Sequence, residues 1–261
     1  MNPWADASSW EGDGLRRHVF FFNSGTERLY GSLYAAIDAR TDVRLVICTG
    51  WGHDMLQLND LDHHLALGIA RLGGAAVLFH PPGHGDSTGS IADLTVQQHV
   101  AAALDAGEVA AKVVGSDGWS FCGVRIGAAV AALASLDGGG RLLPMIEPVL
   151  DLPRHFEALR RRARRVSLGR GDDDILFGHP LPTRAETTPP GRDPAEGVSR
   201  FPGPAAAIRF SDSPAEVLPE GLDVVEVPGR FSNPPGPREQ ATMASAAVRW
   251  IAEAAMAGVA Q

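Results

Sequence analysis

Three glycine-rich turns carry most of the residues in this sequence that could do chemistry. They are Thr-Gly-Trp-Gly-His-Asp at 49–54, His-Pro-Pro-Gly-His-Gly-Asp-Ser at 80–87 and Cys-Gly-Val-Arg-Ile-Gly at 122–127. Glycines allow backbone N–H groups to point into a cleft, as an oxyanion hole requires. We therefore expect Gly52, His53 and the N–H of Ile126 to surround a developing negative charge. Trp51 is expected beside them, against the substrate.

The histidines of the first two turns are candidates for a general base, because an imidazole titrates near neutral pH. We expect His53 to take part in catalysis and His80 to bind substrate, and His84 is a further candidate. For each of them the alternative is a hydrogen bond within its own turn. The histidines do not show metal-site spacing with acidic partners, so no metal is expected.

Arg125 is the unusual residue of the third turn, because it stands at the apex between small residues. A guanidinium stays protonated and cannot attack a carbonyl. We expect Arg125 to bind an anionic substrate group or the charge of a transition state, beside a helix N-terminus that also favours anions. The alternative is a structural ion pair that closes a defunct site, with Asp151 or Asp212 as the partner. These two aspartates are the acidic candidates for catalysis.

Short apolar runs alternate with helical patterns along the chain. The expected strands are 43–49, 75–79, 118–122, 142–149, 205–210 and 222–227, and the expected helices are 59–72, 95–114, 126–136 and 238–257. Runs that are apolar on both faces fit strands of a parallel sheet buried under helices. The alternation predicts a doubly wound, mostly parallel α/β sheet, with an antiparallel hairpin from 17–22 and 26–36. The three turns should meet at the carboxyl ends of the parallel strands.

The order of these elements divides the chain into three parts. Residues 1–16 are expected to form an irregular arm, 17–151 and 205–261 the α/β core, and 152–204 a short lid over the carboxyl edge of the sheet. The lid begins with a basic helix predicted over 156–168, which contains the run from Arg160 to Arg165. A solvated face is the ordinary interpretation of such a run. On a lid it could also bind coenzyme A or an acyl carrier protein.

The turns resemble those of the α/β-hydrolase fold, and the resemblance covers residues 18–255. His80 to Ser87 is similar to the family's Asp-x-Pro-Gly-x-Gly-x-Ser turn, with His80 in place of the acid. Gly123 to Gly127 stands where the family has its nucleophile elbow, Gly-x-Ser-x-Gly. The resemblance implies an acid after the strand at 205–210, which is Asp212, and a histidine after the last strand. No histidine follows His179, so the serine and the histidine of the family's catalytic set are both missing.

A narrower resemblance is to the exosortase-A-system-associated hydrolase group. It rests on Gly-Val-Arg-Ile-Gly-Ala at 123–128, on Glu147 to Asp151, on the basic helix and on Phe177 to Leu181. Members of that group have a similar Gly-Leu-Arg-Leu-Gly-Ala elbow, with arginine at its apex. The resemblance implies a fold more than a reaction.

Composition narrows the function further. The 261 residues carry a net charge of −8 and two cysteines, which disfavour nucleic-acid binding and fit a reducing cytoplasm. No run approaches the roughly 18 apolar residues that a membrane span needs. We expect an enzyme without a serine nucleophile or a cofactor that acts on an acyl or anionic small molecule, by hydrolysis, acyl transfer or lyase chemistry. The alternative is an inactive hydrolase-fold protein that binds an anionic ligand or a carrier protein.

Overall fold

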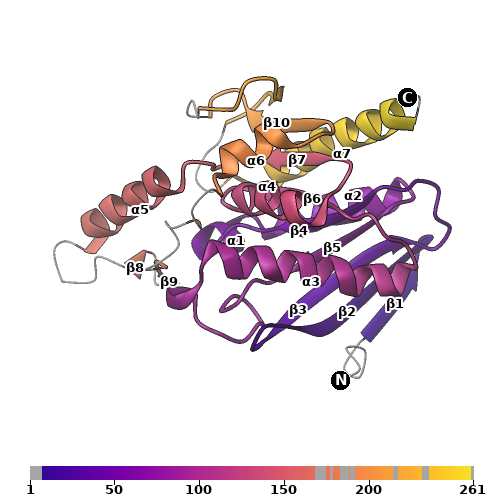
Figure 1. Ribbon diagram of the computed structural model, residues 1–261, viewed down its shortest axis with the longest axis horizontal. Coiled ribbons are helices and arrows are strands. Elements are labelled where there is room, and N and C mark those ends of the chain that lie inside the picture. Colours follow the sequence, from indigo (N-terminus) through magenta and orange to yellow (C-terminus); the bar gives the residue numbers. More distant parts are fainter. Residues whose placement is uncertain are drawn as a thin grey trace.

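The computed structural model describes residues 8–167, 175–176, 179–182, 188, 192–213, 217–230 and 235–259. Nine strands within these ranges form one sheet, in the order β1-β2-β3-β5-β4-β6-β7-β10-β11 (Figure 1). Their bounds are β1 Ser8–Gly12, β2 Leu15–Ser24, β3 Glu27–Ala36, β4 Arg44–Cys48, β5 Ala75–Phe79, β6 Ser120–Val124, β7 Leu143–Ile146, β10 Ala205–Phe210 and β11 Asp223–Val227. Two short strands, β8 (Ile175–Leu176) and β9 (His179–Pro180), pair with each other outside this sheet.

The N-terminal strands of the sheet are antiparallel. β2 pairs with β3 from Leu15 opposite Ala36 to Ser24 opposite Glu27, so the predicted hairpin is confirmed. β1 pairs with β2, and the expectation of an irregular arm over 1–16 is therefore wrong for residues 8–12 and for the start of β2. Residues 8–11 of β1 are all exposed. A strand without a buried face shows no alternation of polar and apolar residues that could reveal it.

The other strands of the nine-stranded sheet, β5, β4, β6, β7, β10 and β11, are parallel to one another, as predicted. The strands expected over 75–79 and 205–210 have the observed bounds of β5 and β10. The other four predicted strands differ at their ends, and for two of them the difference lies where the backbone leaves the extended region. β6 begins only at Ser120, because Gly118 has a φ of +82°. β7 ends at Ile146, because Glu147 has a φ of +47°.

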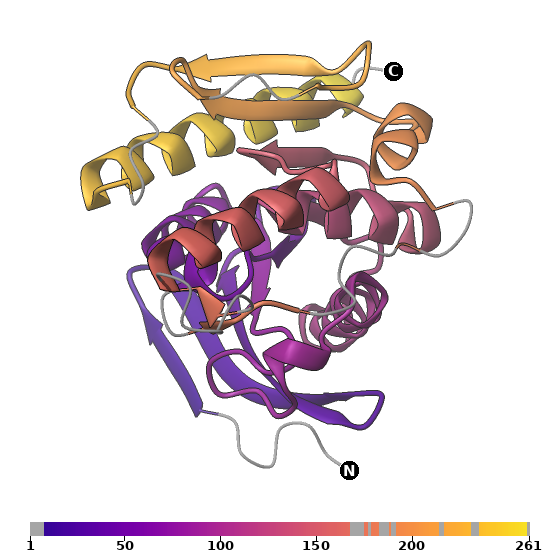
Figure 2. The same ribbon diagram turned by 90° about the vertical axis from the view of Figure 1, so that its left-hand side faces the viewer.

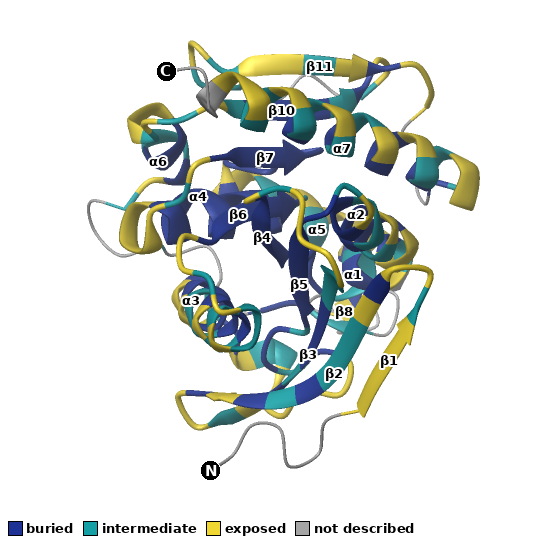
Figure 3. Cartoon of the chain, turned by 90° about the vertical axis from the view of Figure 1, so that its right-hand side faces the viewer, coloured by how far each residue is buried: buried dark blue, intermediate teal, exposed yellow. Residues whose placement is uncertain are grey.

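Helices cover both faces of the sheet, which confirms the doubly wound arrangement. Their bounds are α1 His53–Gln57, α2 Asn59–Arg71, α3 Val96–Val114, α4 Gly127–Gly138, α5 Leu152–Ser167, α6 Pro194–Arg200 and α7 Pro237–Val259, with a short 3-10 helix at Ile91–Asp93. Residues of α3 and α4 share one hydrophobic cluster with the sheet, and residues of α2 and α7 share a second. Figure 3 shows the central strands buried between these layers. The small side chains of α4 allow that helix to pack closely on the strands.

The insertion between β7 and β10 contains α5 and α6. α5 begins at Leu152 rather than at the predicted 156, because the Asp151 carboxylate accepts a hydrogen bond of 3.0 Å from the N–H of Arg154 and so caps the helix. Figure 1 shows α5 reaching out from one end of the molecule, and in Figure 2 it lies in front of the central part. None of the helices that the structure describes is long and apolar enough to span a membrane.

Candidate functional site

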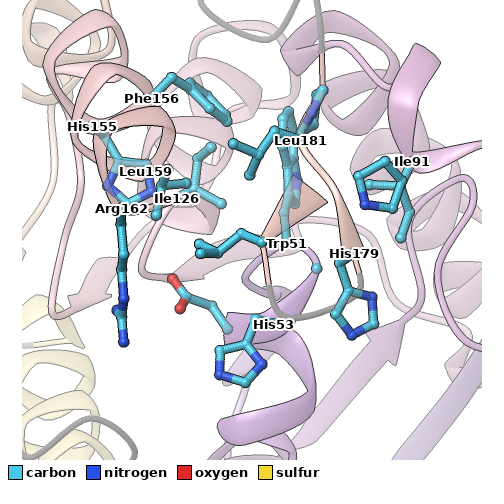
Figure 4. Close-up of a pocket in the computed structure, with 15 residues that line it drawn as sticks. Trp51, His53, Ile91, Ile126, His155, Phe156, Leu159, Arg162, His179 and Leu181 are labelled. Carbon is cyan, nitrogen blue, oxygen red and sulfur yellow. The ribbon is translucent and has the colours of Figure 1, made fainter. Parts of the chain in front are cut away.

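A small cavity lies between the turn after β4 and the insertion, at the carboxyl edge of the parallel strands (Figure 4). Its volume is about 50 Å³. It is lined by Trp51, Gly52, His53, Asp54, Ile91, Ile126, His155, Phe156, Leu159, Arg162, Leu176, His179, Pro180, Leu181 and Pro182. The structure therefore brings four of the expected site residues together: Trp51, Gly52, His53 and Ile126. The other four are not among the lining residues: Arg125, Asp151, Asp212 and His80.

The turn between β6 and α4 is as sharp as its sequence predicts. Arg125 has a φ of +56°, in the left-handed region that side chains other than glycine seldom adopt. Its N–H donates to the carbonyl of Ile146, and its carbonyl accepts from the N–H of Val149. Gly127 has no room for a side chain, because a Cβ would collide with the carbonyl of Cys48. The backbone of β4 and β7 thus forces residue 125 to the apex.

The guanidinium of Arg125 is held by an acid from the neighbouring turn. Its Nε lies 3.4 Å from Oδ2 of Asp54, and its Nη1 donates a hydrogen bond of 3.2 Å to the carbonyl of Glu147. The Arg125 and Asp54 side chains are 18% and 28% exposed. The expected partner Asp151 instead caps α5. Asp54 lines the cavity, so a carboxylate that Arg125 fixes faces the ligand space.

Glu147 and Asp212 lie at the ends of β7 and β10. The carboxylate of Glu147 is buried and accepts hydrogen bonds from the N–H of Phe210, at 2.6 Å, and from the hydroxyl of Ser213, at 2.7 Å. Burial raises the pKa of Glu147. Asp212 lies in this same turn after β10 and is exposed. Glu147 therefore fastens the end of β7 to the turn in which the acid of the resemblance is expected.

One of the expected oxyanion donors is already used. The N–H of Gly52 donates to Nε2 of His84 at 2.7 Å, while Nδ1 of His84 lies 3.1 Å from the carbonyl of Pro82. This pairing fixes the neutral tautomer with its proton on Nδ1. The prediction that the N–H of Gly52 serves as an oxyanion donor is therefore wrong. Among the described residues, the N–H groups of Trp51 and Ile126 have no hydrogen-bond acceptor, although both residues line the cavity.

Solved structures with the same arrangement of elements cover nearly the whole chain. The Est1E protein of Butyrivibrio proteoclasticus with bound ferulic acid superposes with a TM-score of 0.62 at 16% identity, over 90% of this chain and 98% of that one. The proline iminopeptidase of Mycobacterium smegmatis gives 0.62 at 12% identity, over 92% and 99% of the two chains. A serine hydrolase without a lid from Xanthomonas campestris gives 0.57 at 13%, over 95% of each. The chain has the α/β-hydrolase fold. A search against protein-family models and a sequence search of curated proteins find no match.

In the α/β-hydrolase fold the β6–α4 turn is the nucleophile elbow, and here it presents no nucleophile. The apex is Arg125, and no described residue that lines the cavity has a hydroxyl or thiol side chain. Cys122 is fully buried within β6, and burial raises its pKa well above the ordinary value. It is a free thiol packed in the core. The stretch after β11 in which the fold family carries its histidine includes 231–234, which lie outside the described residues.

His80 and His53 differ in their surroundings. The ring of His80 stacks on Tyr30 with its centroid 4.5 Å away, and burial lowers its pKa to about 4. It supports its own turn, since its Nδ1 lies 3.4 Å from the N–H of Asp86. His53 begins α1, lines the cavity and pairs with the Gln57 side chain. Burial also lowers the pKa of His53.

Trp51 is anchored by a histidine that the sequence did not single out. Its Nε1–H donates to Nδ1 of His99 at 2.6 Å. His99 is fully buried on α3, and burial lowers its pKa to about 3, so its imidazole is neutral. Its Nε2 has no hydrogen-bond partner in the described part of the chain. This contact fixes the indole as a wall of the cavity.

The insertion supplies three further site residues that were missed: His155, Arg162 and His179. Figure 4 shows His155 and Arg162 reaching from α5 and His179 from the opposite wall. Burial and then the charge of Arg125 lower the pKa of His155 to about 4, while Asp54 acts in the opposite direction. His155, Leu159 and Arg162 recur at helical spacing beside the buried Phe156, and this spacing was the available signal. No group of histidine, cysteine and acidic side chains able to hold a metal occurs in the described ranges.

Proposed function

We propose that the protein hydrolyses short acyl esters or thioesters by direct attack of water, without an acyl-enzyme. The observation that carries this proposal is the pair of unpaired N–H groups, from Trp51 and Ile126, at the wall of one cavity. Two backbone donors aimed at a carbonyl oxygen stabilise the charge of a tetrahedral intermediate, and removal of one such donor costs about 3–4 kcal/mol in other enzymes. The elbow is held by backbone hydrogen bonds of Arg125 to Ile146 and Val149, which favours donors that are already in place.

In this mechanism His155 is the general base. Its neutral imidazole takes a proton from water as the water oxygen attacks the carbonyl carbon, and the carbonyl π electrons move to the oxygen held by Trp51 and Ile126. Collapse of the intermediate re-forms the carbonyl and expels the alcohol or thiol, which takes the proton back from His155. Asp54 favours the protonated imidazole, and Arg125 holds Asp54 in place. Arg125 is therefore a positioning residue rather than a contact for substrate.

The shape of the cavity favours a small acyl group. Ile91, Phe156, Leu159 and Leu181 supply apolar walls around a volume of about 50 Å³, whereas ordinary ligand pockets have about 300–1,000 Å³. Among the described residues that line the cavity, Arg162 is the one arginine. It would contact an anionic group of the substrate. We propose that 152–204 acts as a lid, since α5 forms one wall and must move to admit a leaving group of any size.

Turnover of acetyl and butyryl esters and thioesters tests this mechanism. His155→Gln should lower kcat/KM by at least about 100-fold, as expected for loss of a general base. His64→Gln is the matched control, because His64 lies on the exposed face of α2 and outside the cavity. A fluorophosphonate probe should leave the protein unlabelled. Full activity of His155→Gln would refute the role of His155, and labelling would show a serine nucleophile.

The second candidate is an inactive relative that binds a small acid. It is favoured by the hydrogen bond from Gly52 to His84, which removes one donor from the cavity, and by the ion pair of Arg125 with Asp54. Thermal-shift measurements with acetate and butyrate, alongside the ester assays, separate the two candidates. Stabilisation by these acids without turnover at high protein concentration supports the inactive relative.

The basic surface of α5 suits a negatively charged carrier of the acyl group. The helix contains six arginines and one glutamate between Leu152 and Ser167, a balance that suits the phosphates of coenzyme A or of an acyl carrier protein. We propose one of these as the leaving group, in a cytoplasmic enzyme of the exosortase-associated hydrolase group. Acetyl-CoA should then be cleaved with a lower KM than an acetyl ester of a neutral thiol. Equal KM values would remove the carrier from the proposal.

A further inference from the structure

A second and larger cavity lies at the opposite edge of the sheet, where the parallel strands begin. Its volume is about 730 Å³, within the range of roughly 300–1,000 Å³ found for ligand pockets. The starts of β4 and β6, the end of α2 and the last turns of α7 surround it. In Figure 1 this end of α7 and the protruding α5 lie at opposite ends of the molecule. The two cavities are therefore separate sites.

Arg44 is the buried charge of this cavity. The residue is 8% exposed, and its Nη1 donates to the carbonyls of Thr41 and Val43 at 2.7 and 2.9 Å. Its Nε is buried without an acceptor, and no described residue accepts a hydrogen bond from its Nη2. Because Nε has no accessible surface, Nη2 is the donor that Arg44 can offer to one oxygen of a carboxylate in the cavity.

The charge around Arg44 also favours an anion. The cavity is lined by Arg40, Arg44 and Arg141 against one acid, Asp42, which leaves two positive charges in excess. Asp42 is engaged by Nη1 of Arg141 at 3.1 Å. Burial lowers the pKa of Arg44, and the charge of Asp42 offsets this only in part, because a charge that is removed from water is destabilised. A bound anion would relieve this cost.

Apart from Thr41 and Ser120, the remaining lining residues are apolar or glycine, and several of them lie on α7. Leu72, Ala252, Ala255 and Met256 are among them, and Met256 is 68% exposed. One cationic end joined to an apolar wall distinguishes an amphiphile from a simple anion. We propose that this cavity binds a medium-chain fatty carboxylate, with the carboxylate on Arg44 and the alkyl chain along α7. The site does not depend on the chemistry proposed for the other cavity.

Binding of decanoate tests the site directly, by calorimetry below its micellar concentration. Decanoate should bind with one molecule per chain. Decan-1-ol, which lacks the charge, and acetate, which lacks the chain, should each bind at least about tenfold more weakly, a difference of about 1.4 kcal/mol. No binding of decanoate, or equal binding of decan-1-ol, would overturn the proposal.

Two variants locate the site on the chain. Arg44→Met removes the guanidinium, and Ala255→Trp fills the apolar part; each should weaken decanoate binding at least about tenfold. Ala257→Trp is the matched control, because Ala257 is exposed on the same helix and does not line the cavity. Ala255→Trp alone decides the outcome if Arg44→Met fails to fold. Equal affinities of Ala255→Trp and Ala257→Trp would refute the location, and ester turnover is expected to be unchanged in both.

Discussion

The backbone of the elbow makes a sharp prediction about residue 125. With its φ of +56°, any residue with a Cβ costs about 1–2 kcal/mol there relative to the right-handed region. Arg125→Gly and Arg125→Ala lose the same guanidinium contacts, so the difference between them isolates this backbone cost. Glycine loses more conformational freedom on folding, by about 0.5–1 kcal/mol. The glycine variant should therefore be more stable than the alanine variant by about 0.5–1 kcal/mol.

Urea and thermal unfolding measure this difference. For a chain of this length, 1 kcal/mol corresponds to a shift in Tm of roughly 2–4 °C, so glycine should raise Tm over alanine by roughly 1–4 °C. Glu253 on α7 provides the control, because it is exposed in regular helix; there alanine should be the more stable by about 1 kcal/mol. If alanine at position 125 equals or exceeds glycine in stability, the left-handed elbow is wrong, and with it the placement of the Ile126 N–H.

Three further predictions follow from the buried contacts. In a double-mutant cycle, Arg125→Met and Asp54→Asn should show a coupling of about 1 kcal/mol in the free energy of unfolding, because the pair is only partly exposed; additive effects would mean that no ion pair forms. His99 has a pKa of about 3 when folded and about 6.5 when unfolded, so the unfolded chain binds the extra proton between these values. Stability should therefore fall by about 1.4 kcal/mol per pH unit as the pH drops below about 6, and His99→Asn, titrated with urea at each pH, should remove that part of the slope. Gly127→Ala should destabilise the fold by at least about 3 kcal/mol, since its Cβ would meet the rigid carbonyl of Cys48; a loss below about 1 kcal/mol would mean that β4 can shift.

Much of the fold could be predicted from the sequence, because strands and helices are signalled by patterns of neighbouring residues. The run Ala75–Phe79 is apolar on both faces and became β5 without change. The capping box of Thr95 and Gln98 begins α3 where the helical pattern starts. β1 was missed for the same reason, since Ser8–Gly12 is an exposed edge strand whose residues carry no periodic signal. Its pairing with β2 is visible only in three dimensions.

The site was predicted less completely, because contacts between turns decide what each residue can do. The type of residue 125 predicts that the apex carries no nucleophile, but it does not reveal the partner of Arg125, Asp54, which lies 71 positions earlier in the chain. The glycines of the first turn suggested free N–H groups, and that of Gly52 is instead taken by His84 from the second turn. His155 lies on α5, where the run of arginines is the dominant feature of the sequence. The first two differences are pairings between turns that no local pattern encodes, whereas the helical spacing of His155 with Leu159 could have indicated its place on the inner face.

Arg125 at the apex of the elbow also determines contacts of the neighbouring turn. A guanidinium at the apex has to be balanced, and Asp54 balances it from the turn that also carries Trp51. The ion pair therefore ties the segment after β4 to the turn after β6. A carboxylate is left at the cavity wall, where its charge opposes the lowering of the pKa of His155 by burial and by Arg125. In the proposed mechanism this carboxylate, the His155 imidazole and the two backbone donors surround a water molecule. Arg125 acts in two directions there, because it holds Asp54 in place and its own charge lowers the pKa of His155.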